Sequence, residues 1–272
     1  MLRPRQRMAS VSGEVPGRSA ERPATEVETP PSRMPLVRLE VLGAGECARA
    51  RDAVLALRDR WVARSREAPA FTLGASAGNT DGAQPRVYRA RAARDNPVLA
   101  EAFGWLHERL EERLSELLGE PVRRTPQFGL PGFVIYLGAD PTPAARPPIH
   151  YDCQYRLLPW AAHHRHVDLD SAVSMTLPIS LPPRPGSGLY WWELPLETAV
   201  ERGLSAATSF PPRAAFAALE RHFHPYRLGE TTLHGAHVPH QAAFPDELRP
   251  GEERISLQVH SLVCDGVRWL YF

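Results

Sequence analysis

The chain has 272 residues and a formal net charge of +1, a length sufficient to bury the core of one large domain or two small ones. Because no single-sign charge field dominates, we expect neither a dedicated nucleic-acid-binding protein nor a membrane-surface protein. Every basic side chain is an arginine, which excludes a lysine nucleophile or Schiff base. Three scattered cysteines are typical of a reducing, cytoplasmic setting without a disulfide framework.

The first 34 residues differ in composition from the rest. They are rich in Arg, Pro, Ser and Glu and contain almost no large apolar side chain, so burial cannot offset the entropy of ordering them. We expect a disordered tail over 1–34, a helical support region over 35–125 and a β-rich core domain over 126–272. No run is apolar and long enough to cross a bilayer, and the N-terminus lacks the apolar segment of a signal peptide.

Two helices are expected in the support region, after a short strand over 37–41. The first covers 46–64. The second begins at a cap on Asp95 or Asn96, with Pro97 in its first turn, and ends before Gly119. Its apolar residues recur at three- and four-residue steps and predict a core face: Leu99, Phe103, Leu106, Leu110, Leu114 and Leu117.

After Pro121 the pattern changes to short β-rich runs broken by Pro and Gly. These runs cover 132–138, 149–155, 172–181, 188–194, 226–233, 240–244 and 255–264. Many short strands with such punctuation are typical of a sandwich or barrel. The fold class we expect is therefore mainly β, with a jelly-roll core and helices packed on its outside.

The triplet His150-Tyr151-Asp152 is the first candidate metal site. Residues two apart on a strand point to the same face, with Cα atoms roughly 6.5 Å apart. A distant second histidine would complete a two-His-one-carboxylate facial triad, which leaves open positions on non-haem Fe(II). An incidental ion pair on a core or surface strand is the alternative interpretation.

Three histidines compete for the distal position. We favour His240, because Gly235 marks a turn and His240 opens the strand that follows it. His237 is the second choice, and His234 is more typical of a capped or solvated side chain. The cluster at 163–166 has no carboxylate at ligand spacing and is expected to form a solvated loop.

Arg254 and Ser256 share one face of the last predicted strand, with Gln258 and His260 beyond them. A carboxylate buried without a partner is costly, and Arg binds one bidentately without losing its proton. This pair therefore indicates a clamp for a keto-acid cosubstrate. An edge strand with a solvent-facing Arg254 is the alternative.

Trp191 and Trp192 follow a glycine-rich turn, and one of them must face inward if this segment is a strand. Stacking on a substrate and a position in the core or at its rim both stay open. The loops over 139–148 and 155–167 are candidates for the mouth of the pocket.

The order of these motifs resembles that of the Fe(II)/2-oxoglutarate-dependent dioxygenases, above all the prolyl-4-hydroxylase-like and phytanoyl-type members. His150, Asp152 and His240 match the family's iron ligands, and Arg254 and Ser256 match its clamp for the 2-oxoglutarate carboxylate. Tyr136, within the similar segment Phe133–Gly138, matches a tyrosine that helps to hold 2-oxoglutarate. Further segments similar to the family are Leu233–Gly235, and Ser174–Leu181 followed by Gly186, Gly188 and Leu189.

This resemblance covers 132–263 and departs from the family at two places. The step from His240 to Arg254 is 14 residues, somewhat longer than is usual, and the Pro- and Ala-rich segment between Tyr136 and His150 does not match closely.

The resemblance implies an enzyme that uses Fe(II), 2-oxoglutarate and O2, with no catalytic side chain beyond the metal centre. It implies hydroxylation of a small molecule, an amino acid or a peptidyl side chain, coupled to decarboxylation of 2-oxoglutarate to succinate. Asp152 favours hydroxylation or desaturation over halogenation, because halogenating relatives replace this carboxylate. Two alternatives remain: a cupin-type metalloenzyme that does not use 2-oxoglutarate, and a non-catalytic jelly-roll binding or sensing protein.

Overall fold

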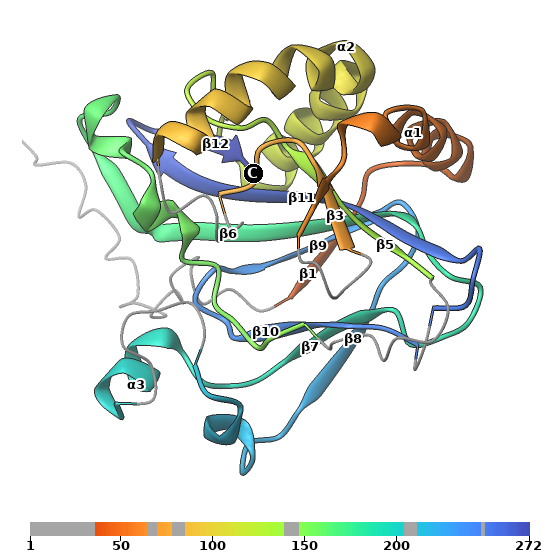
Figure 1. Cartoon of the computed structure of the whole chain (residues 1–272). Helices are drawn as coiled ribbons and strands as arrows, with labels where there is room; N and C mark the ends of the chain where they lie inside the picture. The colour runs from red at the N-terminus through yellow and green to blue at the C-terminus, as the bar shows by residue number, and fades with distance from the viewer. Residues whose placement is uncertain (1–35, 65–69, 78–84, 139–146, 204–210, 246–247) are drawn as a thin grey trace, which may run out of the picture.

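The computed structural model describes residues 36–64, 70–77, 85–138, 147–203, 211–245 and 248–272. Three layers are visible in Figure 1: the helices α1 (Ala44–Ala56) and α2 (Pro85–Leu118), a large sheet beneath them, and a small sheet below. The predicted tail over 1–34 lies outside the described residues. Within them, no helix combines the length and apolar character needed to span a membrane.

The large sheet has nine strands among the described residues. Its main path runs β1 (Val37–Glu40), β9 (Glu230–Gly235), β6 (Val167–Ser180), β11 (Glu253–Cys264), β5 (Gly132–Leu137), β3 (Ala70–Leu73) and β2 (Val62–Ala63). Off this path, β12 (Val267–Tyr271) pairs with the second half of β11 and, in parallel, with β4 (Val122–Arg124).

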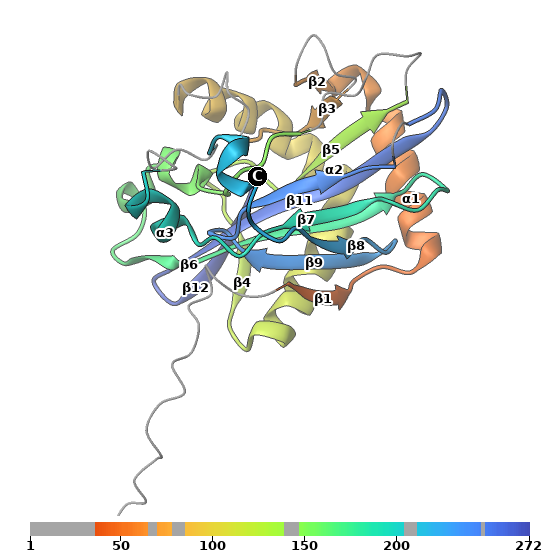
Figure 2. The same cartoon turned by 90° about the horizontal axis from the view of Figure 1, so that it is seen from below.

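The small sheet consists of β10 (His240–Ala243), β7 (Gly188–Trp191) and β8 (His222–Pro225). The chain crosses from the large sheet to the small one between β6 and β7 and again between β9 and β10, and it returns between β8 and β9 and between β10 and β11. Figure 2 shows the strands of the small sheet in front of those of the large sheet. This alternation between two facing sheets is a jelly roll, so the predicted fold class is confirmed.

The second helix begins earlier than the sequence predicted. α2 starts at Pro85, and Pro97 lies inside it, so the prediction of a cap at Asp95 or Asn96 was wrong. Asn96 instead bonds the chain beside the helix: its amide donates to Phe128 O at 2.8 Å and accepts from Leu130 N at 3.0 Å. Tyr88 and Ala92, which precede Pro97, are buried, so tertiary packing rather than a local cap supports the first turns of the helix.

The first helix is shorter than predicted. α1 ends at Ala56, and a 3₁₀ turn over Arg58–Arg60 leads into β2. At the helix end, Val54 O accepts both from Leu57 N at 3.2 Å and from the Trp61 indole at 3.1 Å. The expected helix over 46–64 is therefore corrected to a helix, a turn and an edge strand.

Three predicted strands also differ from the structure. The run over 149–155 forms only an isolated bridge at His150 and a 3₁₀ helix over Gln154–Leu157. The run over 226–233 overlaps only β9, because Tyr226 lies in the turn between β8 and β9. The run over 188–194 ends as a strand at Trp191, and no pattern predicted β12.

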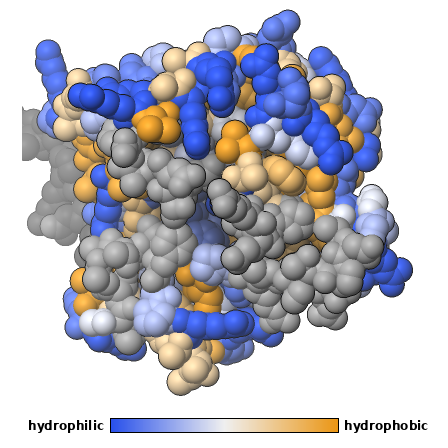
Figure 3. Space-filling model, in the orientation of Figure 1, coloured by the Kyte–Doolittle hydropathy of each residue, from blue (hydrophilic) through white to orange (hydrophobic). Residues whose placement is uncertain are grey.

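The main apolar cluster fills the space between the helices and the large sheet. Leu99, Phe103, Leu106, Leu110 and Leu114 of α2 are fully buried there, as the stripe predicted, whereas Leu117 is 41% exposed. From the sheet, β11 contributes Ile255, Leu257 and Val259. Hydrophilic side chains gather on the outside of the helix layer (Figure 3), so both helices are amphipathic.

Candidate metal centre

Strand pairing within the small sheet brings the predicted ligands together. His150 forms an isolated antiparallel bridge with His240: His150 N donates to His240 O at 3.0 Å, and His240 N donates to His150 O at 2.9 Å. Directly opposite residues of an antiparallel pair point to the same face, and the two imidazole centroids lie 4.3 Å apart. Asp152 is fixed beside them, because its backbone N donates to Ala236 O at 3.0 Å.

The three side chains converge on one point between the sheets. One potential ligand atom from each of His150, Asp152 and His240 lies within 4.8 Å of the others. The closest approaches to the carboxylate are made by Nε2 of each ring, at 3.3 Å for His240 and 3.6 Å for His150. Among the described residues this is the single group of three or more His, Cys, Asp or Glu side chains that could hold a metal ion.

The second nitrogen of each ring fixes its tautomer. Nδ1 of His150 lies 3.0 Å from Pro148 O, and Nδ1 of His240 lies 3.0 Å from Val238 O. A carbonyl only accepts, so each Nδ1 carries the proton and donates it. Nε2 is therefore the ring nitrogen that each histidine can offer to a metal ion beside Asp152.

The protonation states suit a divalent cation. Burial alone would raise the pKa of Asp152, but the surrounding imidazoles, His240 first, hold it well below its usual range. Burial lowers the pKa of His240 well below its ordinary value, and Asp152 only partly opposes this. The site thus presents a carboxylate beside a neutral His240 imidazole, and metal binding needs ligands in these unprotonated states.

Two further histidines surround this group. The His234 ring lies 4.3 Å from the His240 ring, and its Nδ1 donates to Gly235 O at 3.0 Å. Nδ1 of His260 lies 3.0 Å from the Ser174 hydroxyl and 3.8 Å from Asp152 Oδ2. Burial lowers the pKa of both histidines. The expectation of a capped or solvated His234 was wrong about solvent, since this side chain is buried on the inner face of β9.

His237, the second choice for the distal ligand, is directed away from the group. Its Nε2 lies 2.8 Å from the Tyr155 hydroxyl, and its Nδ1 lies 2.8 Å from Glu197 Oε1 of α3 (Leu196–Glu201). Tyr155 follows Asp152 in the chain and His237 precedes His240. The contact therefore ties together the two loops that carry the candidate ligands.

Gln154 holds the carboxylate from the same loop. Its amide nitrogen donates to Asp152 Oδ1 at 3.0 Å. Alternation along a strand would put Gln154 on the same face as His150 and Asp152. The contact exists, but a 3₁₀ turn brings it about.

Arg254 lies on the inner face of β11 and is 2% exposed. Its Nη1 donates to Ala243 O at 3.0 Å, while its Nε has no hydrogen-bond partner among the described residues. Three rings surround the guanidinium, with centroids 4.5 Å away for Phe244, 5.1 Å for Tyr226 and 5.8 Å for Tyr136. The alternative of a solvent-facing Arg254 is therefore wrong.

Ser256 and Tyr136 are both near Arg254, and Ser256 lies two residues further along β11. Tyr136 is the cross-strand partner of Arg254 on β5. The Ser256 hydroxyl is buried and has no partner among the described residues. Tyr226 was not singled out by the sequence, because its place beside Arg254 depends on the turn after β8. Burial raises the pKa of Tyr226, against the opposing effect of Arg254, so its phenol stays a neutral donor.

The histidine-rich loop over 163–166 is separate from this site. The side chain of Asp265 accepts from the backbone N of Arg165 and His166, and lies 3.3 Å from His164 Nδ1. The loop is largely exposed, as expected, although Asp265 anchors it.

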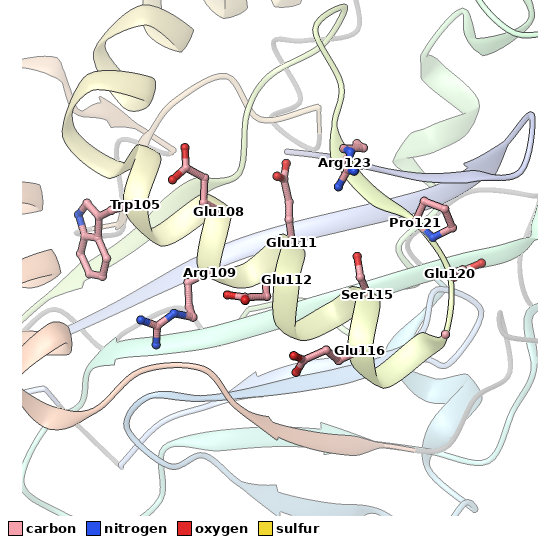
Figure 4. A pocket seen from close by; sticks show the side chains of 11 residues that line it. Trp105, Glu108, Arg109, Glu111, Glu112, Ser115, Glu116, Glu120, Pro121 and Arg123 are labelled. Atoms are coloured by element: carbon pink, nitrogen blue, oxygen red, sulfur yellow. The ribbon is translucent and has the colours of Figure 1, made fainter.

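An open surface depression lies on the other side of the large sheet (Figure 4). It is lined by the outer face of α2 and the segment after it, including Trp105, Glu112 and Arg123. Several of its acidic side chains already have arginine partners: Glu111 with Arg124, Glu116 with Arg113 and Glu120 with Arg268. The helix layer and the sheet separate it from His150, Asp152 and His240.

Comparison with known proteins gives a broad structural likeness. No protein-family model matches the chain, and no curated protein matches it. Among solved structures, an N-substituted L-amino acid dioxygenase from Burkholderia ambifaria AMMD has a TM-score of 0.48 at 13% identity, over 87% of this chain and 86% of that one. The non-haem α-ketoglutarate-dependent epimerase SnoN from nogalamycin biosynthesis has 0.48 at 17% identity, over 84% and 81%.

A Pseudomonas putida prolyl-4-hydroxylase has a TM-score of 0.38 at 19% identity, over 86% of this chain and 94% of that one. At such TM-scores the likeness carries no argument about function, so the function has to be argued from the side chains of the site.

Proposed function

We propose that this chain is an Fe(II)- and 2-oxoglutarate-dependent oxygenase that hydroxylates a small molecule. One observation carries the proposal. A carboxylate and two imidazole nitrogens lie within 4.8 Å of one another, and a buried guanidinium with an unpartnered Nε lies on the face of β11 that is turned toward β10 of the small sheet.

His150, Asp152 and His240 would hold the iron. Two nitrogens and one carboxylate oxygen form the donor set of non-haem Fe(II) oxygenases, and the described residues offer no fourth group to close the coordination sphere. The fixed Nδ1–H donors hold both rings in the tautomer that binds metal. Gln154 steadies Asp152.

Arg254 and Ser256 would hold the distal carboxylate of 2-oxoglutarate. A buried guanidinium whose Nε lacks a partner is costly unless an anion completes it. The Ser256 hydroxyl is a second donor left without a partner among the described residues. Tyr136 and Tyr226 add ring faces beside the cation. These features support a carboxylate ligand and disfavour a cupin-type enzyme that does not need one.

The protein's own contribution is orientation and exclusion of water. Bound iron and 2-oxoglutarate supply the oxidising power for breaking a substrate C–H bond with O2. Arg254 would fix the distal carboxylate of 2-oxoglutarate, and this would orient the keto-acid end of the cosubstrate toward the metal ligands. The aromatic rings around Arg254 keep water from its charge, which strengthens the ion pair.

The proposal is tested by measuring succinate formed from 2-oxoglutarate after air is admitted to anaerobically reconstituted Fe(II) protein. We expect slow turnover in the wild type and no turnover in either Asp152→Ala or Arg254→Ala. Asp95→Ala is the matched control, because Asp95 is also a buried carboxylate but pairs with Arg94 on α2. Its turnover should equal that of the wild type.

Binding separates this function from its rivals. Titration with N-oxalylglycine, a non-reacting analogue of 2-oxoglutarate, should show metal-dependent binding that Arg254→Ala weakens at least about thirtyfold, since losing one partner of a buried charge pair typically costs 2–5 kcal/mol. Metal binding with no affinity for this analogue would indicate a cupin-type enzyme. Binding of metal and analogue without any succinate would indicate a sensing protein.

A further inference from the structure

A row of side chains crosses the small sheet beside the candidate metal centre. His150 is opposite His240, His240 is opposite Trp191 on β7, and Trp191 is opposite His222 on β8. Directly opposite residues of antiparallel strands point to the same face, with Cβ atoms about 4.5–5.5 Å apart. Trp191 is therefore the neighbour of a candidate iron ligand, on the face that holds the iron ligands.

The Trp191 ring is stacked on His222 and on no other ring of the described residues. The two ring centroids lie 4.3 Å apart at an interplanar angle of 27°. Trp191 is only partly buried and belongs to neither apolar cluster of the described residues. A large ring that faces the metal side without joining the core lacks the usual reason for an inward tryptophan.

Trp192 and Tyr190, the neighbours of Trp191 in sequence, both pack against other parts of the protein. Trp192 points the other way, is 4% exposed and packs 5.3 Å from Phe216. Tyr190 lies on the outer face of the sheet, 5.4 Å from Phe223, with the Arg221 guanidinium 4.3 Å from its ring centroid. Of these three aromatic side chains, Trp191 alone lies on the metal side.

Acidic side chains border this stack. Glu193 Oε1 lies 3.9 Å from Nε2 of His222, and Glu220 Oε1 lies 3.9 Å from its Nδ1. Both carboxylates are mostly exposed, at 77% and 82%. The neighbouring cation, Arg221, is turned to the outer face. Two carboxylates against one imidazole leave this rim negative whatever the charge of His222.

We propose that Trp191 and His222 form the substrate-binding wall of the site, and that the substrate carries a protonated amine attached to a planar ring. The ring stacks on Trp191, and the ammonium group lies at the rim toward Glu193 and Glu220. A tryptophan face attracts both a flat ring and a cation. This inference rests on the proposed function, because the wall serves a substrate only if the neighbouring His240 holds the reactive metal.

The test uses three matched probes: 2-phenylethylamine, which is a cation at neutral pH, 2-phenylethanol, which is neutral, and phenylacetate, which is an anion. Their binding is measured by equilibrium dialysis of the full chain. Broadening of their NMR lines by Mn(II), loaded in place of Fe(II), reports whether the bound probe lies beside the metal.

We expect the amine to bind about fivefold to thirtyfold more tightly than the alcohol, with its lines broadened by Mn(II). Trp191→Ala should weaken amine binding about tenfold or more, and Trp191→Phe by less, since a smaller ring keeps part of the stacking. The double change Glu193→Gln, Glu220→Gln should bring the amine and the alcohol to similar affinity. Tyr190→Ala, on the opposite face of the same strand, should leave amine binding unchanged.

Equal amine binding by wild type and Trp191→Ala would overturn the inference, as would equal affinity of the wild type for amine and alcohol. Mn(II) affinity of each variant confirms that the fold around the metal is intact. Failure of the proposed function looks different. Dialysis without metal would still show Trp191-dependent amine binding, while Mn(II) binding and succinate formation would be missing.

Discussion

The two faces of β11 show how this protein divides stability from function. On the face toward the helices, Ile255, Leu257 and Val259 are at most 1% exposed and join the main apolar cluster. On the opposite face, toward the small sheet, Arg254 and Ser256 are equally buried but polar.

The two faces differ in whether the buried groups find all their contacts within the protein. The apolar side chains are fully packed within the protein, because α1 and α2 cover them. The polar side chains make only some of their possible hydrogen bonds, since Arg254 Nε and Ser256 Oγ have no hydrogen-bond partner among the described residues. Burying polar groups without partners is unfavourable. The inner face therefore sacrifices stability to present unsatisfied donors to a ligand.

The largest effect we expect on the polar side comes from Asp152→Ala. Metal affinity should fall at least about a hundredfold, because loss of an outer-shell partner of a metal ligand alone costs tenfold to a hundredfold. Isothermal titration with Mn(II) measures this. A variant that binds Mn(II) as tightly as the wild type would remove Asp152 from the ligand set.

Two adjacent residues sharpen the comparison of the faces. Leu257→Ala should lower the free energy of unfolding by about 2–5 kcal/mol, since it opens a cavity in a packed cluster. Ser256→Ala should change it by less than about 0.5 kcal/mol, because the lost hydroxyl had no partner among the described residues. Denaturant titration gives both values. For ligand binding the order should reverse: Ser256→Ala should lower the affinity for N-oxalylglycine, and Leu257→Ala should leave that affinity unchanged.

A pH titration of stability tests the helix side. His107 of α2 is fully buried with its Nε2 2.9 Å from Pro131 O, and burial, with Arg124 nearby, lowers its pKa to about 4. Below pH 6.5 the unfolded chain takes up a proton that the folded chain refuses, so stability falls between pH 6.5 and 4, by up to about 3 kcal/mol. His107→Gln should flatten this part of the curve. If the free energy of unfolding fell equally with decreasing pH in the wild type and in His107→Gln, His107 would not be the group responsible.

The smallest effect should come from the contact between the two ligand loops. Tyr155→Phe removes the hydroxyl that lies 2.8 Å from His237 and should cost about 1 kcal/mol of stability, together with a severalfold loss of Mn(II) affinity. Tyr151→Phe is the control, because the Tyr151 hydroxyl donates only to Leu194 O. It should lose similar stability and keep its metal affinity. Equal metal affinity in both variants would show that the contact only stabilises the fold.

Local patterns in the sequence were enough for the broad architecture. The stripe from Leu99 to Leu114 predicted a buried helix face, and the alternation from Arg254 to His260 assigned both faces of β11 correctly. The candidate ligand triplet could also be found, because His150 and Asp152 are two residues apart. Each of these signals lies within a few residues of chain and therefore needs no knowledge of the fold.

Where the local pattern competed with packing, the sequence misled. Asn96 has the chemistry of a helix cap, but its amide bonds Phe128 and Leu130. His150 and Asp152 meet without the strand that their spacing suggested, because a bridge to His240 and a bond to Ala236 place them.

The sequence by itself determined that this protein would be mainly β, with amphipathic helices outside, and which residue types could bind a metal and a carboxylate. Only the tertiary structure separated the two candidates for the distal ligand: His240 lies beside His150 and Asp152, whereas His237 contacts Tyr155 and Glu197. It also brought Tyr226 to Arg254 and Trp191 beside His240. The physical reason is that these contacts join segments far apart in the chain, and strand register and crossovers set them.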